Sequence, residues 1–514
     1  MALLGQIIKR YLKIKNSFSL PNATPRRYQE LELRRLLKKS EHTLFGKFYN
    51  FSNFSSSKDP YQRFANEVPF FNYSSMFEQW WNLSHKGEAD VAWPGKVKYF
   101  ALSSGTSESA SKHIPVTQDM VKSTKRTGFK QFCSLLHFNL PDSVFSKGVL
   151  MLGGTTSLFE KEGYYEGDMS GISAKEMPKW LSYFFYKPGQ KISKRPRWED
   201  RINLIVRNAK KWDVSIVAGV PAWVQIVLER VVEYHGVNHI HEIWPNLSLY
   251  IHGGVSFEPY RDSFKKVLGR NIVFIETYMA SEGSFGFQSR PGVKGISLVT
   301  NNSIFYEFVP FTADNFDEEG EIKQGSKAYR IHEVVEDKDY AIVISTCSGA
   351  WRYLIGDVLR FTDVVNAEII IVGRTKQFLS LCGEHLSVDN MNKAVEVAQQ
   401  KLGITIKEFT VMGAPHNGMF AHKWYISCDS TVDKDQLRDT IDQTLCEIND
   451  DYATERTSAL KEVMVEVLPA QLFLDFLEKK GKTGAMNKFP RVMKGKQKVE
   501  WEGFVNGSLT NRQN

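Results

Sequence analysis

The sequence has little of what marks secreted, membrane-spanning or cysteine-metal proteins. Its 514 residues include only five cysteines, an odd number, and no two of them form a Cys-x-x-Cys pair. This indicates neither a disulfide framework nor a cysteine zinc site, and it favours a reducing compartment. The longest nearly uncharged apolar stretch, 214–228, is too short to cross a bilayer and is interrupted by Pro221. We therefore expect a cytoplasmic protein.

The chain also lacks a strong charge of either sign. Lys and Arg number 66 against 58 for Asp and Glu, which gives a net charge of +8. So small an excess fits a phosphate-bearing ligand but is also ordinary for a solvated surface, and we expect no nucleic-acid partner. With 42% apolar and 24% charged residues, and at roughly 150 residues per domain, the composition predicts a globular protein of two or three domains.

The N-terminal residues 1–16 do not have the pattern of a signal peptide. Apolar pairs recur there at helical spacing, with basic residues interleaved among them. Such a helix can lie on a membrane surface, but packing on its own domain is the interpretation that we prefer. A second helix is expected from Thr24, a good N-cap residue, and Pro25. Its buried stripe is expected to consist of Leu31, Leu33, Leu36 and Leu37.

Strand-like runs alternate with helical patterns, which predicts an α/β fold. The strand-rich segment 319–372 is expected to form a β-barrel-like part of a large N-terminal domain, 1–373. A small, mobile α+β domain is expected at 374–514. The expected strands are 149–152, 214–218, 272–275, 341–344, 369–372, 409–412 and 424–427, and the expected helices are 198–211, 222–234, 388–402 and 434–449.

The strongest chemical signal is a run of small and hydroxyl residues that follows the strand-like 99–102. Phosphate oxygens need many donors at close range, and backbone N–H groups, hydroxyls and one lysine supply them. A Ser/Gly-rich surface loop stays open as the alternative. The Walker pattern is absent, because Phe476 stands where that pattern needs a glycine before Gly481-Lys482-Thr483. The candidate phosphate loop is Ser103, Ser104, Gly105, Thr106 and Ser107, with Lys112.

Three further motifs have residues suited to a nucleotide. Glu282, in the run 278–283 after the strand-like 272–275, is a candidate Mg²⁺ ligand, and Ser281 beside it can bond a phosphate. Asp357, at the Gly-Asp step that ends the run 351–357, can accept both hydroxyls of a ribose. Each of these is also consistent with a simple turn. The weaker pair Gly253-Gly254 leaves room for an adenine against the backbone.

The order of these motifs resembles the adenylate-forming superfamily of acyl-CoA synthetases, luciferases and peptide-synthetase adenylation domains. A finer match, over nearly the whole chain, is to the auxin-responsive Gretchen Hagen family of acyl acid amido synthetases. Any single motif is weak evidence, but several in the same order are specific. The finer match is carried by Thr43 to Lys47, Ser103 to Glu108, Tyr278 to Glu282 and Trp351 to Asp357.

The resemblance implies roles for individual residues. The Ser103 loop with Lys112 would hold the ATP phosphates, and Gly253-Gly254 and Tyr278 would lie by the adenine. Ser281 would contact the α-phosphate, Glu282 would bind Mg²⁺ and Asp357 would hold the ribose. In Gly373-Arg374-Thr375-Lys376, Lys376 would be the pivot about which the C-terminal domain rotates. Lys488, in Lys488-Phe489-Pro490-Arg491, would reach the α-phosphate, with Lys494 and Lys496 as nearby alternatives.

The function implied is an ATP-dependent ligase that converts a carboxylic acid to an acyl-AMP and passes the acyl group to an amine, with an amino acid expected. Lys488, Lys112 and Glu282 would be its catalytic residues, and ATP and Mg²⁺ its cofactors. An acyl-CoA ligase and a non-catalytic relative that binds nucleotide or acid are the alternatives. The chain departs from the plant members, which usually have Tyr at Trp351 and Arg at Leu354, so their hormone substrates do not transfer.

Overall fold

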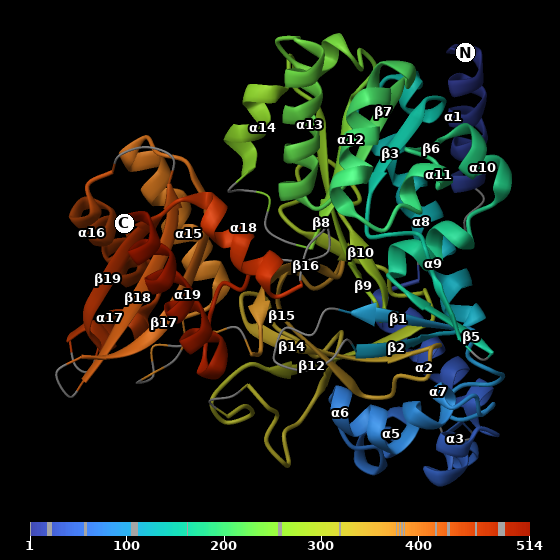
Figure 1. Cartoon of the computed structure of the whole chain (residues 1–514). Coiled ribbons are helices and arrows are strands. Elements are labelled where there is room, and N and C mark those ends of the chain that lie inside the picture. Colours follow the sequence, from blue (N-terminus) through green and yellow to red (C-terminus); the bar gives the residue numbers. More distant parts are fainter. Residues whose placement is uncertain are drawn as a thin grey trace.

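The computed structural model forms a large body and a C-terminal body beside it (Figure 1). None of the helices it describes is long and apolar enough to span a membrane. The described residues are 2–17, 23–55, 59–103, 112–161, 163–254, 257, 260–317, 320–376, 378–379, 381, 384, 386–416, 419–428, 432–457, 460–481 and 489–513.

One twelve-stranded sheet runs through the large body, in the order β13-β12-β14-β15-β16-β11-β10-β9-β8-β7-β3-β6. From β6 to β9 the neighbouring strands are parallel, and from β9 to β13 they are antiparallel. Its strands are β3 (Gly148–Leu152), β6 (Tyr186–Lys187), β7 (Val214–Gly219), β8 (Leu249–Gly253), β9 (Val273–Ala280), β10 (Gly283–Phe287), β11 (Ile296–Leu298), β12 (Ile304–Pro310), β13 (Tyr329–Arg330), β14 (Asp339–Thr346), β15 (Tyr353–Asp363) and β16 (Glu368–Arg374).

Helices follow the parallel strands, as right-handed strand–helix–strand units require. Their apolar faces form a core with β3, β7 and β8 that includes Trp244 and Tyr250. The strands of the segment 319–372, which we expected to be barrel-like, continue this same sheet on its antiparallel side. The helices of this half are α8 (Gln118–Ser134), α9 (Met169–Lys175), α10 (Lys179–Phe184), α11 (Gln190–Ser193), α12 (Trp198–Asn208), α13 (Pro221–His235) and α14 (Arg261–Val267).

A smaller sheet of four strands, in the order β2-β1-β5-β4, lies near the N-terminal helices (Figure 1). Its strands are β1 (Tyr99–Ser103), β2 (Lys112–Val116), β4 (Phe159–Lys161) and β5 (Tyr164–Gly167). β1 and β2 form a hairpin in which Ser103 pairs with Lys112. The two ends of the candidate phosphate loop are therefore held side by side.

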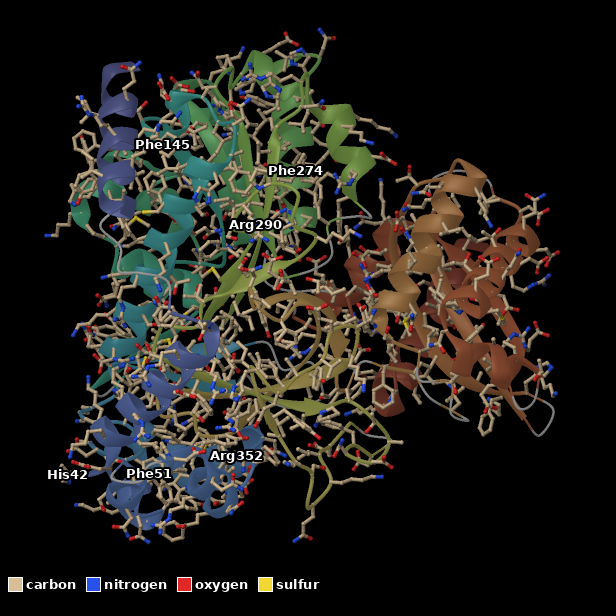
Figure 2. All side chains as sticks on the ribbon, turned by 180° about the vertical axis from the view of Figure 1, so that it is seen from behind. His42, Phe51, Phe145, Phe274, Arg290 and Arg352 are labelled. Carbon is tan, nitrogen blue, oxygen red and sulfur yellow. The ribbon has the colours of Figure 1, made fainter. Side chains whose placement is uncertain are left out.

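The N-terminal helices surround a second, largely aromatic core. Trp351 is fully buried in it, stacks on Phe45 and packs edge-on against Phe51. Figure 2 labels Phe51 and Arg352 at this end of the molecule. The helices are α2 (Pro25–Ser40), α3 (Leu44–Phe48), α4 (Phe51–Ser55), α5 (Pro60–Glu67), α6 (Tyr73–Met76) and α7 (Asn82–His85), with a π-helical turn at Phe77–Trp81.

The first two helices agree with the sequence prediction in all but one position. In α1 (Ala2–Ser17) the buried side chain of Leu12 packs on the large body, and Lys9 forms a 2.8 Å ion pair with Asp142, so the helix packs on its own domain. Thr24 caps α2 as expected. Leu31 was wrongly assigned to the buried stripe: it is 45% exposed, because it points away from the side of α2 that carries Leu33, Leu36 and Leu37.

The C-terminal body is a three-stranded sheet, β17-β18-β19, with helices packed against it. The helix predicted at 388–402 is α15 with the same bounds, and the one predicted at 434–449 is α16. The elements are α15 (Val388–Leu402), β17 (Ile406–His416), β18 (Met419–Cys428), α16 (Lys434–Ile448), α17 (Asp450–Thr457), β19 (Leu460–Leu468), α18 (Ala470–Lys479) and α19 (Gly495–Gln513).

Candidate functional site

The large sheet brings Tyr278 of β9 and Asp357 of β15 into contact. The Tyr278 hydroxyl donates a 2.7 Å hydrogen bond to Oδ2 of Asp357. Arg374 lies opposite Asp357 on the neighbouring strand β16, and its Nε is 3.1 Å from Oδ1. Both carboxylate oxygens are therefore oriented by fixed donors. Burial raises the pKa of the Tyr278 phenol well above its usual value, and the charge of Asp357 adds to this.

Asp357 owes its position to a local backbone arrangement that a glycine makes possible. Gly356 has a φ of +89°, a left-handed conformation that glycine adopts without strain. Its carbonyl accepts a 2.8 Å hydrogen bond from the Thr375 N–H, and the carbonyl of Ile355 accepts one of 3.0 Å from Arg374. The Gly-Asp step is thus tied to the end of β16.

Glu282 lies in a hairpin turn. The sequence led us to end the preceding strand at 275, which was wrong: β9 runs to Ala280, because the polar residues in it pair with β8 on one side and β10 on the other. Only Ser281 and Glu282 separate β9 from β10. Glu282 is 8% exposed, and its Oε1 is 3.5 Å from the Tyr353 hydroxyl.

The half-buried Lys112 and the carboxylate of Glu282 lie close enough for each charge to shift the pKa of the other group. Burial lowers the pKa of Lys112, while the negative charge of Glu282 raises it. Conversely, burial raises the pKa of Glu282, and Lys112 and Arg374 lower it. The Nζ of Lys112 also lies 5.3 Å from the centre of the Tyr73 ring. The structure therefore places a buried carboxylate among cations where the β1–β2 hairpin meets the large sheet.

Other predicted site residues have different surroundings. Gly253 ends β8 opposite Thr277, and a Cβ there would overlap the Thr277 carbonyl oxygen, so close strand packing already requires this glycine. Gly254 is exposed, with φ +85°. Lys376 forms an ion pair with Glu321. The nucleotide roles of these three residues stay predictions.

Part of the predicted site lies outside the described residues, namely Ser104, Gly105, Thr106, Ser107 and Lys488. Ser103 is the last residue of β1. The segment just after Lys488 is anchored: Arg491 donates a 2.6 Å hydrogen bond to Glu408 on β17. Tyr260 of the large body donates a 3.2 Å bond to the same carboxylate, so this segment lies where the two bodies meet.

Sequence reasoning did not assign Arg374 and Tyr353 to the site. Both residues stand in motifs that we had identified, Arg374 in the hinge motif and Tyr353 in the run 351–357. A motif does not specify which strand of the sheet lies next to its own strand, so their partners could not be predicted. The first two residues of the run 351–357 hold the fold together and do not face the site. The indole N–H of Trp351 donates a 3.0 Å bond to the Ala92 carbonyl, and Arg352 is buried in an ion pair.

Chemically, this arrangement suits an anionic ligand with a neighbouring diol. The cations and the buried carboxylate can hold phosphates together with a divalent metal ion, since Mg²⁺ is bound by one or two carboxylates plus phosphate oxygens. Asp357, with its two oxygens already directed, can accept hydroxyl hydrogens. A nucleoside triphosphate has both kinds of group.

Most of the chain matches three domains of one protein family. The GH3 family N-terminal domain matches residues 15–209, its central domain residues 297–371 and its C-terminal domain residues 389–497. A probable indole-3-acetic acid-amido synthetase, GH3.9 of Oryza sativa subsp. japonica, is 26% identical over 206 residues, 38% of this chain and 45% of that protein. The jasmonoyl–L-amino acid synthetase JAR6 of Nicotiana attenuata is 26% identical over 215 residues, 39% and 36% of the two chains. The chain thus spans less than half the length of either relative.

Two solved structures share the fold over nearly the whole chain. The acyl acid amido synthetase AtGH3.15, solved in complex with 2,4-DB, has a TM-score of 0.74 at 16% identity and covers 95% of this chain and 97% of its own. A 2-hydroxyisobutyryl-CoA ligase, solved in the post-adenylation state with 2-HIB-AMP, has a TM-score of 0.58 at 12% identity and covers 95% and 92%. At these identities the likeness shows the fold.

Proposed function

This chain belongs to the GH3 family, and on this premise we propose that it is an ATP-dependent ligase that activates a carboxylic acid as an acyl-AMP and joins it to an amine. An amino acid is the proposed acceptor, because one of the relatives, JAR6, is a jasmonoyl–L-amino acid synthetase. One observation carries the proposal: Glu282, Lys112 and the Asp357–Tyr278 pair, which come from separate motifs, interact across one junction of two sheets.

In this proposal Asp357 holds the ribose and Tyr278 lies by the adenine. Asp357 needs no rearrangement, because its carboxylate is already oriented by Tyr278 and Arg374. Preorganised groups bind with less loss of conformational freedom than mobile ones. Ser103 to Ser107 and Lys112 hold the phosphates, and Gly253-Gly254 border the base.

The first half-reaction is an in-line displacement at the α-phosphorus. A carboxylate oxygen of the acid forms a bond to this phosphorus while the bond to pyrophosphate breaks. Positioning and charge neutralisation dominate such reactions. Lys112 supplies positive charge at the phosphates, Ser281 contacts the α-phosphate, and Lys488 reaches it from the C-terminal body.

Glu282 fits the role of a magnesium ligand. The residue is nearly buried, its Oε1 accepts only a long, 3.5 Å hydrogen bond from the Tyr353 hydroxyl among the described side chains, and carboxylate oxygens suit Mg²⁺. Bound there, the ion would supply positive charge to the triphosphate and the leaving pyrophosphate. The role of Glu282 itself is to hold a negative charge where Lys112 and Arg374 offset the cost of its burial.

In the second half-reaction the amine nitrogen attacks the acyl carbonyl, the bond to AMP breaks, and the amine loses a proton. We propose that the C-terminal domain, 374–514, rotates about Lys376 between the two steps. The Lys376–Glu321 ion pair is exposed, and exposed pairs contribute little energy, so it would not impede such a rotation. The proposed compartment is the cytoplasm, and the proposed partners are small acids and amino acids.

The test is to incubate the protein with ATP, Mg²⁺, a library of carboxylic acids and mixed amino acids, and to identify products by mass spectrometry. Acid-dependent pyrophosphate release together with an N-acyl amino acid is expected. Release that yields an acyl-CoA only when CoA is added would indicate the acyl-CoA ligase instead. Nucleotide binding without pyrophosphate release for any acid would indicate a non-catalytic relative.

A further inference from the structure

A second group of titratable side chains lies beside the candidate site. His113 follows Lys112 on β2 and so points to the opposite face of the strand. On that face it meets His85, at the end of α7, and Glu166 of β5. Oε1 of Glu166 is 2.9 Å from Nε2 of His85 and 3.0 Å from Nδ1 of His113. These three atoms all lie within 4.8 Å of one another.

We propose that His85, His113 and Glu166 bind one divalent transition-metal ion, with Zn²⁺ as the ion that best suits them. Two imidazole nitrogens and one carboxylate oxygen are an established ligand set for zinc, whereas Mg²⁺ and Ca²⁺ prefer oxygen alone. Metal–ligand bonds of about 2.0–2.2 Å in a tetrahedron separate the ligand atoms by roughly 3.3 Å, close to the distances seen here.

The strand register supports a common focus for the three side chains. In the four-stranded sheet, Glu166 pairs with Phe100, and His113 pairs with Leu102, two residues further along β1. Residues two apart on a strand face the same way, so Glu166 and His113 lie on one face, on either side of β1. α7 delivers His85 to that face, where its ring packs edge-on against Phe100.

The alternative is a purely hydrogen-bonded cluster, in which each imidazole donates to the carboxylate. His85 Nε2 does form a hydrogen bond with Glu166, but the buried Nδ1 of His113 has no hydrogen-bond partner among the described residues. Both nearest approaches are to the same oxygen of Glu166, and the Tyr164 hydroxyl lies 3.1 Å from the same Nε2 of His85.

The position of the ion suggests its purpose. β1 lies between β2 and β5, so an ion held by His113 and Glu166 would bridge β2 and β5 across β1. β1 ends at Ser103 and β2 begins at Lys112, and both residues belong to the proposed phosphate site. The ion would therefore act as a structural clamp on the paired ends of these two strands, at the opposite face from the Lys112 side chain. Its binding does not depend on the proposed function, whereas any effect on ATP rests on it.

The test measures metal binding to the full chain without nucleotide. After removal of metal with EDTA, Zn²⁺ is titrated by calorimetry, and Co²⁺ is added to follow its visible absorption. We expect one ion per chain, tetrahedral Co²⁺ bands, and a rise in melting temperature with Zn²⁺. His113→Asn and Glu166→Gln should each weaken binding at least about tenfold and abolish the Co²⁺ bands, since even second-layer changes cost 10- to 100-fold.

Matched controls use similar residues away from the group. His42, which is labelled in Figure 2, has a side chain that is 88% exposed, and Glu160 is exposed on β4 of the same sheet. The control variants are His42→Asn and Glu160→Gln. Both variants should bind like the unaltered protein. Substoichiometric binding by the unaltered protein, octahedral oxygen-type Co²⁺ bands, or undiminished binding by both ligand variants would each overturn the proposal. The Co²⁺ spectrum keeps the test decisive if a ligand variant fails to fold.

Discussion

The Tyr278 hydroxyl donates a 2.7 Å hydrogen bond to Asp357 across the antiparallel half of the sheet. The other oxygen of the same carboxylate is 3.1 Å from Nε of Arg374. The tyrosine comes from β9 and the arginine from β16, so two separate strands fix one side chain. A carboxylate fixed in this way can accept hydrogen bonds from both hydroxyls of a diol. Replacing one donor at a time measures how much each contributes to binding of that diol.

Replacement of Asp357 by alanine should weaken ATP binding by about 10- to 100-fold, because hydrogen bonds to a charged group contribute about 1.5–3 kcal/mol. Tyr278→Phe removes one donor to this carboxylate and leaves the acceptor, so we expect a smaller loss, of about fivefold. Calorimetric titration of ATP measures both. An unchanged ATP affinity in Asp357→Ala would rule out the ribose contact.

Replacement of Glu282 by glutamine should reduce acid-dependent pyrophosphate exchange by at least about 100-fold and raise the Mg²⁺ concentration that half-saturates it. Burial raises the pKa of Glu282, so the fold disfavours its charge, and a neutral isostere should not destabilise the protein. We therefore expect an unfolding free energy equal to or above that of the unaltered protein. Lost exchange with an unchanged Mg²⁺ dependence would contradict the metal role.

The sequence allowed two helices of the C-terminal body, α15 and α16, to be predicted closely, because their signals are local. The strands β17 and β18 are longer than the predicted 409–412 and 424–427. Ser387 caps α15 and Gly403 ends it in a left-handed conformation, so the helix bounds could be read from the residues themselves. The end of β9 could not. Glu276 and Thr277 have no strand-like apolar pattern, and they are held in the sheet by pairing with β8 and β10.

The site shows the same division between local and long-range information. Glu282 and Asp357 stand in short motifs and could be proposed from them. Arg374 as the partner of Asp357 depends on which strand lies next to β15, and this information is not in either motif. His85, His113 and Glu166 come from three elements with no common spacing, so only the folded structure brings them together.

Arg352 and Glu307 form a buried ion pair whose loss should be costly. Their side chains are 5% and 1% exposed, 3.0 Å apart, and Arg352 also donates 2.7 Å bonds to the carbonyls of Ala65 and Val68. Arg352→Met leaves Glu307 charged and without its guanidinium partner, so urea unfolding should show a loss of about 3–5 kcal/mol.

The double variant Arg352→Met/Glu307→Leu tests the reason for that loss. Removing both charges should recover part of the stability, because the uncompensated carboxylate is the main cost. The exposed pair Lys265–Asp262 is the matched control, and Lys265→Met should change the unfolding free energy by less than about 1 kcal/mol. A loss in Arg352→Met no larger than in this control would show that the buried pair contributes little.

Lys130 on α8 should make stability depend on pH in the alkaline range. Burial lowers the pKa of Lys130 to about 8, with the positive charge of Arg126 adding to the effect. Below pH 8 the folded and unfolded chains both hold the proton, and the cost of burying the charge is complete. Between pH 8 and about 10.4, the usual lysine value, the folded chain releases its proton first, so the cost falls as pH rises.

Lys130→Met should therefore raise the unfolding free energy at pH 7, by about 1–2 kcal/mol after allowance for partial exposure and for the lost bond to Asn301. The gain should shrink toward pH 10, because there Lys130 is neutral in the folded chain and the cost of burying its charge is largely gone. Urea unfolding at several pH values measures the difference. Lys122→Met, on the same helix with a 71% exposed side chain, should show no such trend. A gain in Lys130→Met that stays constant from pH 7 to 10 would mean that packing, and not the buried charge, sets its stability.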